Sequence, residues 1–150
     1  MTTRAAIVLE AMTWHGTPYH HCADVRGVGV DCAMLLVRVY QACGLTPLDF
    51  DPRPYSYQWH LHRGEELYLG WLQVAGAVQT HAPQAGDVAI WRFGRTYSHA
   101  GVLIDSTQVI HALQESGAVT INRLTETPLA NRDCKFYSIL PNELGANHGR

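Results

Sequence analysis

Cys32 is the residue of this sequence with the clearest capacity for chemistry. It directly follows Asp31, a good N-cap residue, at the expected start of an apolar helix that ends at Gly44. The unpaired N–H groups and the dipole at a helix start favour the thiolate, the nucleophilic form of cysteine, and can also stabilise an oxyanion. The alternative interpretation is a small buried side chain, which is how most free cysteines behave.

Two histidines in consecutive predicted strands can supply the base that a thiol nucleophile needs. If the turn between the strands has three residues, 105–107, His111 faces Gly101, and His99 projects from the same face as a diagonal neighbour. A two-residue turn would place the two rings on opposite faces. With the longer turn, His99 is the candidate base and His111 the residue that orients it. The alternative is two polar side chains on a solvated strand face.

The hydrophobic pattern predicts the scaffold that must position these residues. Helical spacing occurs over residues 3–13, 31–43 and 65–78. After Pro83 the period changes to two, with strand candidates at 87–93, 98–104, 108–113, 118–124 and 134–140. We therefore expect an α+β fold in which N-terminal helices pack on a five-stranded, mainly antiparallel sheet. The long segment 15–30 is interpreted as a functional loop.

Composition and length indicate one domain and exclude several classes of protein. The 150 residues are expected to form a single domain over 1–141 with a loose tail over 142–150. The apolar content of 47% argues against disorder, and a net charge of −2 without a basic stripe argues against nucleic acid as a partner. No apolar run is long enough for a membrane span, and the first ten residues do not resemble a signal peptide.

Nine histidines and four cysteines raise the question of metals and disulfides. Without a secretory signal, the cysteines are expected to stay reduced, and their spacings fit no common structural zinc site. His20, His21 and Cys22 suggest metal binding, but adjacent side chains point apart, so a cleft-lining loop is preferred and no metal or cofactor is predicted. A second cluster is interpreted as packing, with a substrate wall as the alternative: Tyr55, Tyr57 and Trp59.

Five short motifs, taken together, resemble the NlpC/P60 cysteine peptidases in order and spacing. They are GTPY at 16–19, GVGVDC at 27–32, PQAGDV at 83–88, SHAGVL at 98–103 and VIHA at 109–112. The resemblance covers about residues 12–124 and is greatest to the branch encoded by tailed phages and gene transfer agents. This sequence departs from the family at 20–22, where Trp-Gly-Gly is frequent, and at 33–34, where Ser-Gly is common.

The resemblance implies a papain-like fold and hydrolysis of peptide amides in peptidoglycan, usually at the γ-D-glutamyl–diaminopimelate bond of the stem peptide. By the family pattern, Cys32 is the nucleophile, His99 the general base and His111 the third, orienting residue. Tyr19 matches a tyrosine that binds substrate or stabilises the oxyanion. No cofactor is implied.

The resemblance also suggests where the protein works. A protein made in the cytoplasm without a signal peptide would reach the cell wall in a phage-like particle, with tail-tip or hub proteins as its partners. Two alternatives remain at this point. One is a structural tail-tip or hub component with weak or no activity, and the other is an acyltransferase that uses the same cysteine and histidine.

Overall fold

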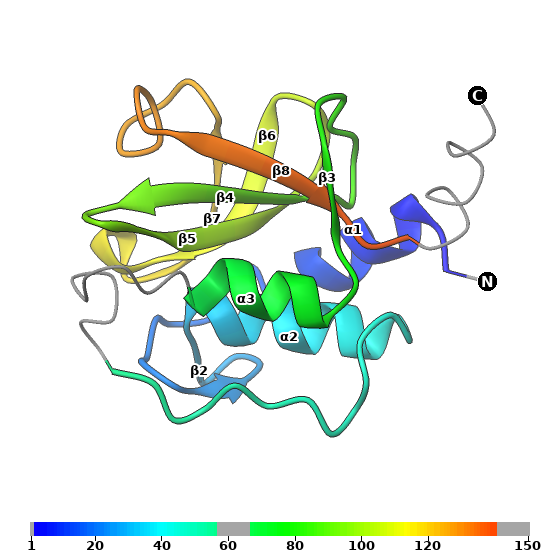
Figure 1. The fold of residues 1–150 in the computed structure, drawn as a ribbon. Coiled ribbons are helices and arrows are strands. Elements are labelled where there is room, and N and C mark those ends of the chain that lie inside the picture. Colours follow the sequence, from blue (N-terminus) through cyan, green and yellow to red (C-terminus); the bar gives the residue numbers. More distant parts are fainter. Residues whose placement is uncertain (1, 57–66, 141–150) are drawn as a thin grey trace, which may run out of the picture.

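Three α-helices lie against one side of a mainly antiparallel sheet (Figure 1) in the computed structural model, which describes residues 2–56 and 67–140. The helices are α1 (Arg4–Met12), α2 (Cys32–Ala42) and α3 (Leu67–Val74). The arrangement confirms the predicted fold class, with the helices first and most of the sheet after them. Among the described residues, no helix is both long and apolar enough to cross a membrane.

The ends of the first two helices follow from local capping chemistry. The Thr3 side chain accepts a hydrogen bond of 3.1 Å from the Ala6 N–H at the start of α1. Asp31 does the same for α2, accepting from the Met34 N–H at 2.9 Å. Gly44 ends α2 in the left-handed region, with φ of 72°. Both helices therefore begin and end close to where the sequence predicts them.

The third helix is shorter than predicted, and the sheet gains a strand. A helix was expected over 65–78, but α3 ends at Val74. Gly76 has φ of 80°, and the N–H groups of Gly76 and Ala77 each donate a 3.0 Å hydrogen bond back to the last turn. The chain then extends into β3 (Val78–Thr80). The sheet thus has six strands where five were expected.

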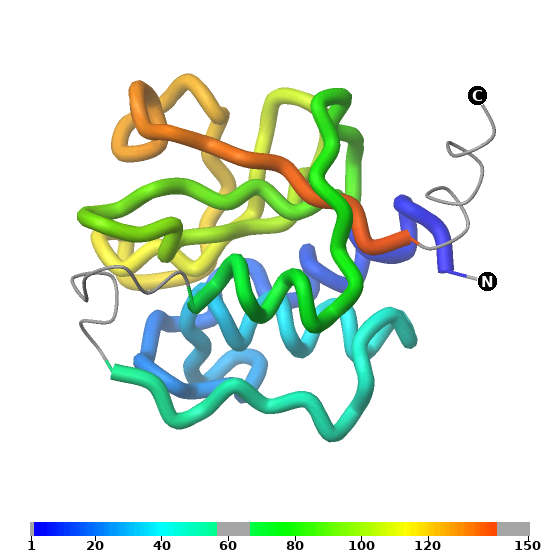
Figure 2. The backbone as a smooth tube through the Cα atoms, viewed as in Figure 1, coloured from blue at the N-terminus to red at the C-terminus, as the bar shows by residue number. Residues whose placement is uncertain are grey.

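The five predicted strands all form. They are β4 (Val88–Phe93), β5 (Thr96–Leu103), β6 (Gln108–Leu113), β7 (Ala118–Arg123) and β8 (Cys134–Ser138). The order across the sheet is β3-β8-β4-β5-β6-β7, so only β4 to β7 form a meander. Figure 2 shows β8 returning across the sheet to lie beside β3. In the loop predicted over 15–30, β1 (Asp24–Val25) and β2 (Gly29–Val30) form a small hairpin.

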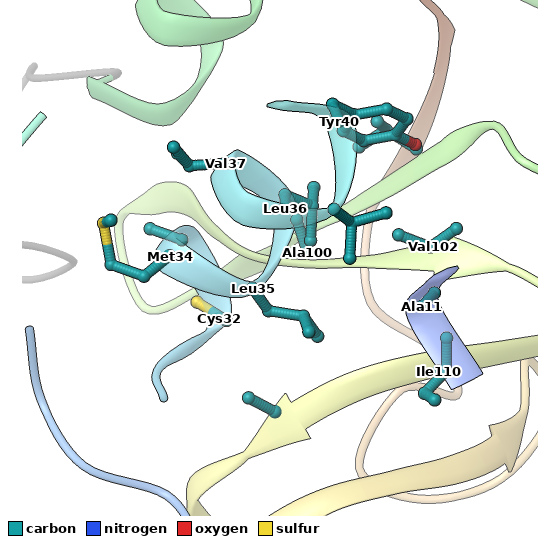
Figure 3. Packing of buried hydrophobic residues seen from close by; sticks show 14 of the residues in the cluster. Ala11, Cys32, Met34, Leu35, Leu36, Val37, Tyr40, Ala100, Val102 and Ile110 are labelled. Atoms are coloured by element: carbon teal, nitrogen blue, oxygen red, sulfur yellow. The ribbon is translucent and has the colours of Figure 1, made fainter. Parts of the chain in front are cut away.

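The sheet buries a different set of side chains on each face. Ala100 and Val102 of β5 pack against α2 in the main hydrophobic core, as Figure 3 shows beside Leu36. Because side chains alternate along a strand, the residues of β5 that alternate with these two face away from the helices. Leu103 belongs to a second buried cluster on that opposite face, together with Trp91. The two histidine motifs belong to β5 and β6, which contribute side chains to both clusters.

Three sequence predictions fall outside the described residues: the tail at 142–150, and the side chains of Tyr57 and Trp59.

Candidate active site

The turn between β5 and β6 has the three residues on which the histidine prediction depends. Val102 pairs with Ile110, and the Ile104 N–H donates to the Gln108 carbonyl at 2.9 Å, which leaves 105–107 as the loop. This register brings Gly101 against β6. A Cβ atom on Gly101 would lie 2.7 Å from the Ile110 oxygen, so a larger residue cannot fit without moving the backbone.

His99 and His111 are in direct contact, as the register requires. Nε2 of His99 lies 2.7 Å from Nδ1 of His111, and the ring centroids are 5.0 Å apart. Both rings are buried on the sheet face that carries Trp91, whose ring centroid is 5.9 Å from that of His99. The predicted shared face of the two imidazoles is therefore present in the structure.

The histidine pair continues into a longer hydrogen-bond chain. Nε2 of His111 lies 2.8 Å from Oδ1 of Asn122, and Nδ2 of Asn122 donates to the Glu126 carboxylate at 3.2 Å. Glu126 is held in turn by the Arg123 N–H at 2.8 Å. Because a carboxylate only accepts, it directs the amide N–H₂ of Asn122 toward itself and the amide oxygen toward His111.

This order of donors and acceptors assigns the protons on both rings. His111 donates from Nε2 to Asn122, so its Nδ1 carries the lone pair and accepts from Nε2–H of His99. The lone pair of His99 is then on Nδ1, which is the basic atom of the pair.

Asn122 and Glu126 were not predicted from the sequence, although the diagonal pairing of strands could have indicated Asn122. Val109 pairs with Asn122 and His111 with Thr120, so Asn122 is the diagonal neighbour of His111 on one face. The same rule had connected His99 with His111. It could not be applied here because the register of β7 depends on a 3₁₀ turn at Gln114–Ser116.

Cys32 begins α2 and meets the backbone of β5. Its thiol donates a long hydrogen bond of 3.6 Å to the Ser98 carbonyl, and the Tyr68 hydroxyl donates to the Cys32 carbonyl at 3.1 Å. Ser98 is the extra residue of a β-bulge, because Trp91 pairs with His99 whereas the next residue of β4 pairs with Tyr97. Bulges of this kind re-aim backbone groups beside functional sites.

The thiol lies beside a stretch of β5 that does not pair with β6. β5 and β6 pair at Val102–Ile110 and Leu103–Val109, and the described residues of β5 before Val102 pair only with β4. His99 belongs to this stretch of β5, and its ring contacts His111 on β6.

The structure thus joins the two imidazoles directly and the thiol only to the backbone next to His99. In the described part of the chain, the Cys32 thiol hydrogen-bonds to the Ser98 carbonyl and to neither imidazole. Ala100 belongs to the helix-facing core with Cys32, whereas the His99 ring contacts Trp91 and Phe93 on the other face. The thiol and the His99 imidazole therefore lie against different faces of the sheet, next to the same segment of β5.

The electrostatics correct one expectation about Cys32. A helix start was expected to lower the pKa of the thiol, but burial raises it, and the neighbouring Asp31 carboxylate raises it further. The backbone N–H groups of Ala100, Cys32 and Ala33 act in the opposite direction and are outweighed. The thiol is therefore neutral at neutral pH, because desolvation penalises a buried anion more than these N–H groups stabilise it.

Burial acts on the histidines in the opposite sense. It lowers the pKa of His99 well below the ordinary value, and repulsion from the protonated form of His111 and from the Arg132 charge acts in the same direction. Burial also lowers the pKa of His111, while the hydrogen bond with Asn122 and the charge of Glu115 raise it. Both rings are neutral at neutral pH, so His99 is able to accept a proton.

Tyr19 and Tyr55 lie around the start of α2. Tyr19 is half-buried against the core and forms a parallel bridge with Val30, two residues before Cys32. The Tyr55 hydroxyl donates to Oδ2 of Asp31 at 2.5 Å, so this ring packs on the helix cap. All four cysteines are free, and no disulfide forms between any of them.

These features together define a papain-like α+β domain with a cysteine at the start of its central helix and a histidine pair on its sheet. The chain belongs to the NlpC/P60 family, whose model matches residues 16–138.

Solved structures of the same family share this fold. The NlpC/p60 domain of the peptidoglycan hydrolase SagA is 22% identical, with a TM-score of 0.60 over 92% of this chain and 99% of that chain. An NlpC/P60 family protein from Bacillus cereus is 18% identical, with a TM-score of 0.64 over 94% of this chain and 42% of its own. The peptidoglycan hydrolase RipB from Mycobacterium tuberculosis is 17% identical, with a TM-score of 0.57 over 91% of this chain and 64% of its own.

This chain spans less than half of the Bacillus cereus chain and less than two thirds of RipB. No curated protein sequence matches it.

Proposed function

We propose that this protein is a cysteine peptidase that hydrolyses amide bonds in the stem peptides of bacterial peptidoglycan. The observation that carries the proposal is the hydrogen bond from the Cys32 thiol, at the start of α2, to the carbonyl of Ser98, the residue directly before His99 of the histidine pair. Membership of the NlpC/P60 family supports the reaction class. Two proteins with similar structures are described as peptidoglycan hydrolases, which supports the substrate class.

In the proposed reaction, the neutral thiol and the neutral imidazole exchange a proton as the substrate is attacked. The thiol of Cys32 turns from the Ser98 carbonyl and gives its proton to Nδ1 of His99, while Sγ bonds to the amide carbon. The carbonyl electrons move onto oxygen, and the N–H groups at the start of α2 together with Tyr19 stabilise that oxyanion. Protonated His99 then donates to the leaving amine as the C–N bond breaks.

Water completes the cycle. It loses a proton to His99, attacks the thioester carbon and displaces the Cys32 sulfur, which recovers the proton. His99 carries a positive charge twice in each cycle, and the groups that are hydrogen-bonded behind its ring stabilise that charge. His111 accepts from His99, while Asn122 and Glu126 hold His111 in the required tautomer. We therefore assign Asn122 and Glu126 a positioning role.

Two further proposals concern the bond that is cut and the particle that carries the protein to the cell wall. The motif pattern favours the γ-D-glutamyl–diaminopimelate bond, and a phage-like tail as the particle that carries the enzyme to the wall. The departure at 20–22 lies near the start of α2, because the Cys22 N–H donates to Asp31 at 2.7 Å. Side chains there are well placed to alter which stem peptide is accepted.

One observation favours a second candidate function. The Cys32 thiol is buried, neutral and hydrogen-bonded to a backbone carbonyl, as a structural cysteine would be. A structural tail-tip or hub component with little activity would have such a thiol. The two functions differ in whether the protein turns over a substrate.

Digestion of purified peptidoglycan with the wild type and with Cys32→Ala separates them, with mass spectrometry of the released muropeptides. The wild type should release fragments cut within the stem peptide, and Cys32→Ala should release none. Cys43→Ala is the matched control, because Cys43 is a free cysteine at the far end of the same helix and should be dispensable. Equal cleavage by Cys32→Ala, or no cleavage by the wild type, would refute the peptidase proposal.

A further inference from the structure

Cys22 has a backbone conformation that brings two adjacent side chains together. Its φ of 61° lies in the left-handed region, which non-glycine residues rarely adopt. The Cys22 sulfur lies 3.3 Å from Nε2 of His21, although neighbouring residues of an extended segment point apart. The sequence argument against a metal at this position assumed such divergence, and the assumption does not hold at Cys22.

A third ligating group completes a compact cluster. Donor atoms of His21, Cys22 and Asp31 all lie within 4.8 Å of one another. Nε2 of His21 is next to the Cys22 sulfur, and Nδ1 of the same ring is 4.0 Å from Oδ2 of Asp31, so the ring must turn for one nitrogen to share an ion with both other groups. The Tyr55 carbonyl adds an oxygen 3.0 Å from Nε2 of His21. Zinc bond lengths of about 2.0–2.3 Å place tetrahedral ligands roughly 3.3–3.8 Å apart, so small side-chain rotations would close this set around one ion.

The composition and burial of the cluster point to one class of ligand. A thiolate, an imidazole and a carboxylate suit Zn²⁺ and related borderline-soft divalent ions, whereas Mg²⁺ and Ca²⁺ select oxygen ligands alone. Asp31 is buried, while His21 and Cys22 are half-buried, so an ion can enter from solvent. Oδ1 of Asp31 can keep its hydrogen bond to the Met34 N–H, which preserves the cap of α2.

We propose that His21, Cys22 and Asp31 form a binding site for a zinc-like divalent cation, separate from the Cys32–His99–His111 group. On binding, the Cys22 thiol loses its proton to solvent and coordinates as thiolate, His21 coordinates as neutral imidazole, and Asp31 exchanges one hydrogen bond at Oδ2 for the metal. Three protein ligands leave a fourth position for water or for the Tyr55 carbonyl. The site does not depend on the proposed peptidase function.

Cobalt(II) tests the site directly, because thiolate coordination to Co²⁺ produces a charge-transfer absorption band and tetrahedral geometry produces strong visible bands. Titration of the full chain should give these bands at one ion per chain, and added Zn²⁺ should abolish them by displacement. Cys22→Ser should remove the charge-transfer band. Cys134→Ser is the matched control, because Cys134 is another half-buried free cysteine far from the cluster, and it should keep the band.

Two further variants test the other ligands. His21→Ala and Asp31→Asn should each weaken binding by at least about tenfold, as expected when a coordination sphere loses a member. Asparagine also caps helices well, so Asp31→Asn should keep the fold, and circular dichroism checks this for every variant. The proposal is overturned if the wild type shows no thiolate band with Co²⁺, or if the band survives Cys22→Ser and is lost in Cys32→Ser.

Discussion

Nε2 of His99 and Nδ1 of His111 are 2.7 Å apart, although the two residues come from different strands. The contact exists because a three-residue turn sets the register and because Gly101 leaves no side chain between the strands. It fixes the tautomer of His99 with the lone pair on Nδ1, and the Cys32 thiol hydrogen-bonds to the carbonyl of the preceding residue, Ser98. The predictions below test this relationship and the elements that maintain it.

Asn122→Ala should lower kcat while leaving KM nearly unchanged, because it removes the acceptor that fixes His111. The loss should be part of the roughly 10²–10⁴-fold that a positioned general base contributes. Nitrogen NMR of the histidine rings provides a second measurement, independent of activity, since His99 should no longer hold its proton on Nε2 alone. Glu126→Gln should have a smaller effect, because the single oxygen of glutamine can accept from Asn122 or from the Arg123 N–H but not from both. Unchanged ring signals in Asn122→Ala would contradict the assigned proton order.

Gly101→Ala should destabilise the protein strongly. The new methyl carbon would lie 2.5 Å from Cγ2 of Val109 and 2.8 Å from Cβ of His111, so β5 and β6 would have to separate. Overpacking of this kind costs about 1–3 kcal/mol of the free energy of unfolding, measured in urea.

Gly70→Ala is the matched control for that substitution. Gly70 lies within α3, and in the described part of the chain no atom apart from its neighbours and the helix backbone is within 4 Å of the position of a Cβ, so alanine there should stabilise the helix by about 0.5–1 kcal/mol. If both variants unfold at the same urea concentration, close packing at Gly101 is not what restricts that position.

The free energy of unfolding should fall as the pH drops below about 6.5. Burial lowers the pKa of His99 and His111 in the folded protein, whereas in the unfolded chain each histidine titrates near its ordinary value of 6.5. The unfolded state therefore binds more protons in this range, so acid favours unfolding, by up to about 1.4 kcal/mol per pH unit for each histidine. Above pH 6.5 both states are neutral at these sites, and this contribution to stability is fully present.

Urea unfolding of wild type and His111→Asn between about pH 5 and 8 measures the effect. The variant is expected to be less stable at neutral pH, but its stability should depend less steeply on pH, because one buried titrating group is gone. Parallel pH profiles for the two proteins would show that the histidine pair is not the source of the acid sensitivity.

Asp105→Ala should lower the melting temperature and loosen the register of β5 and β6. Oδ1 of Asp105 accepts hydrogen bonds from the N–H groups of Thr107 at 2.8 Å and Gln108 at 2.9 Å, which shape the three-residue turn. Asp105→Asn keeps an acceptor at the same place and should behave like wild type. Amide hydrogen exchange at Val102 and Ile110 reports the register, and equal protection in all three proteins would exclude a role for the Asp105 side chain.

Local patterns in the sequence were sufficient for the elements that carry the candidate site. The Asp31 cap and Gly44 bound α2 because capping depends on side chains within one turn of the helix end. The shared face of His99 and His111 followed from strand alternation only for a three-residue turn, and the structure decided that length over the two-residue alternative. The five predicted strands followed from that local alternation.

Tertiary structure decided everything that depends on distant pairing or burial. β3 exists because β8 returns to pair with it, and no local pattern in Val78–Thr80 specifies that partner. Asn122 reached His111 only through the register of β7. The pKa of Cys32 rises because the packed helix and sheet remove water from the thiol. This desolvation outweighs the lowering of the pKa that was expected from the position of Cys32 at a helix start.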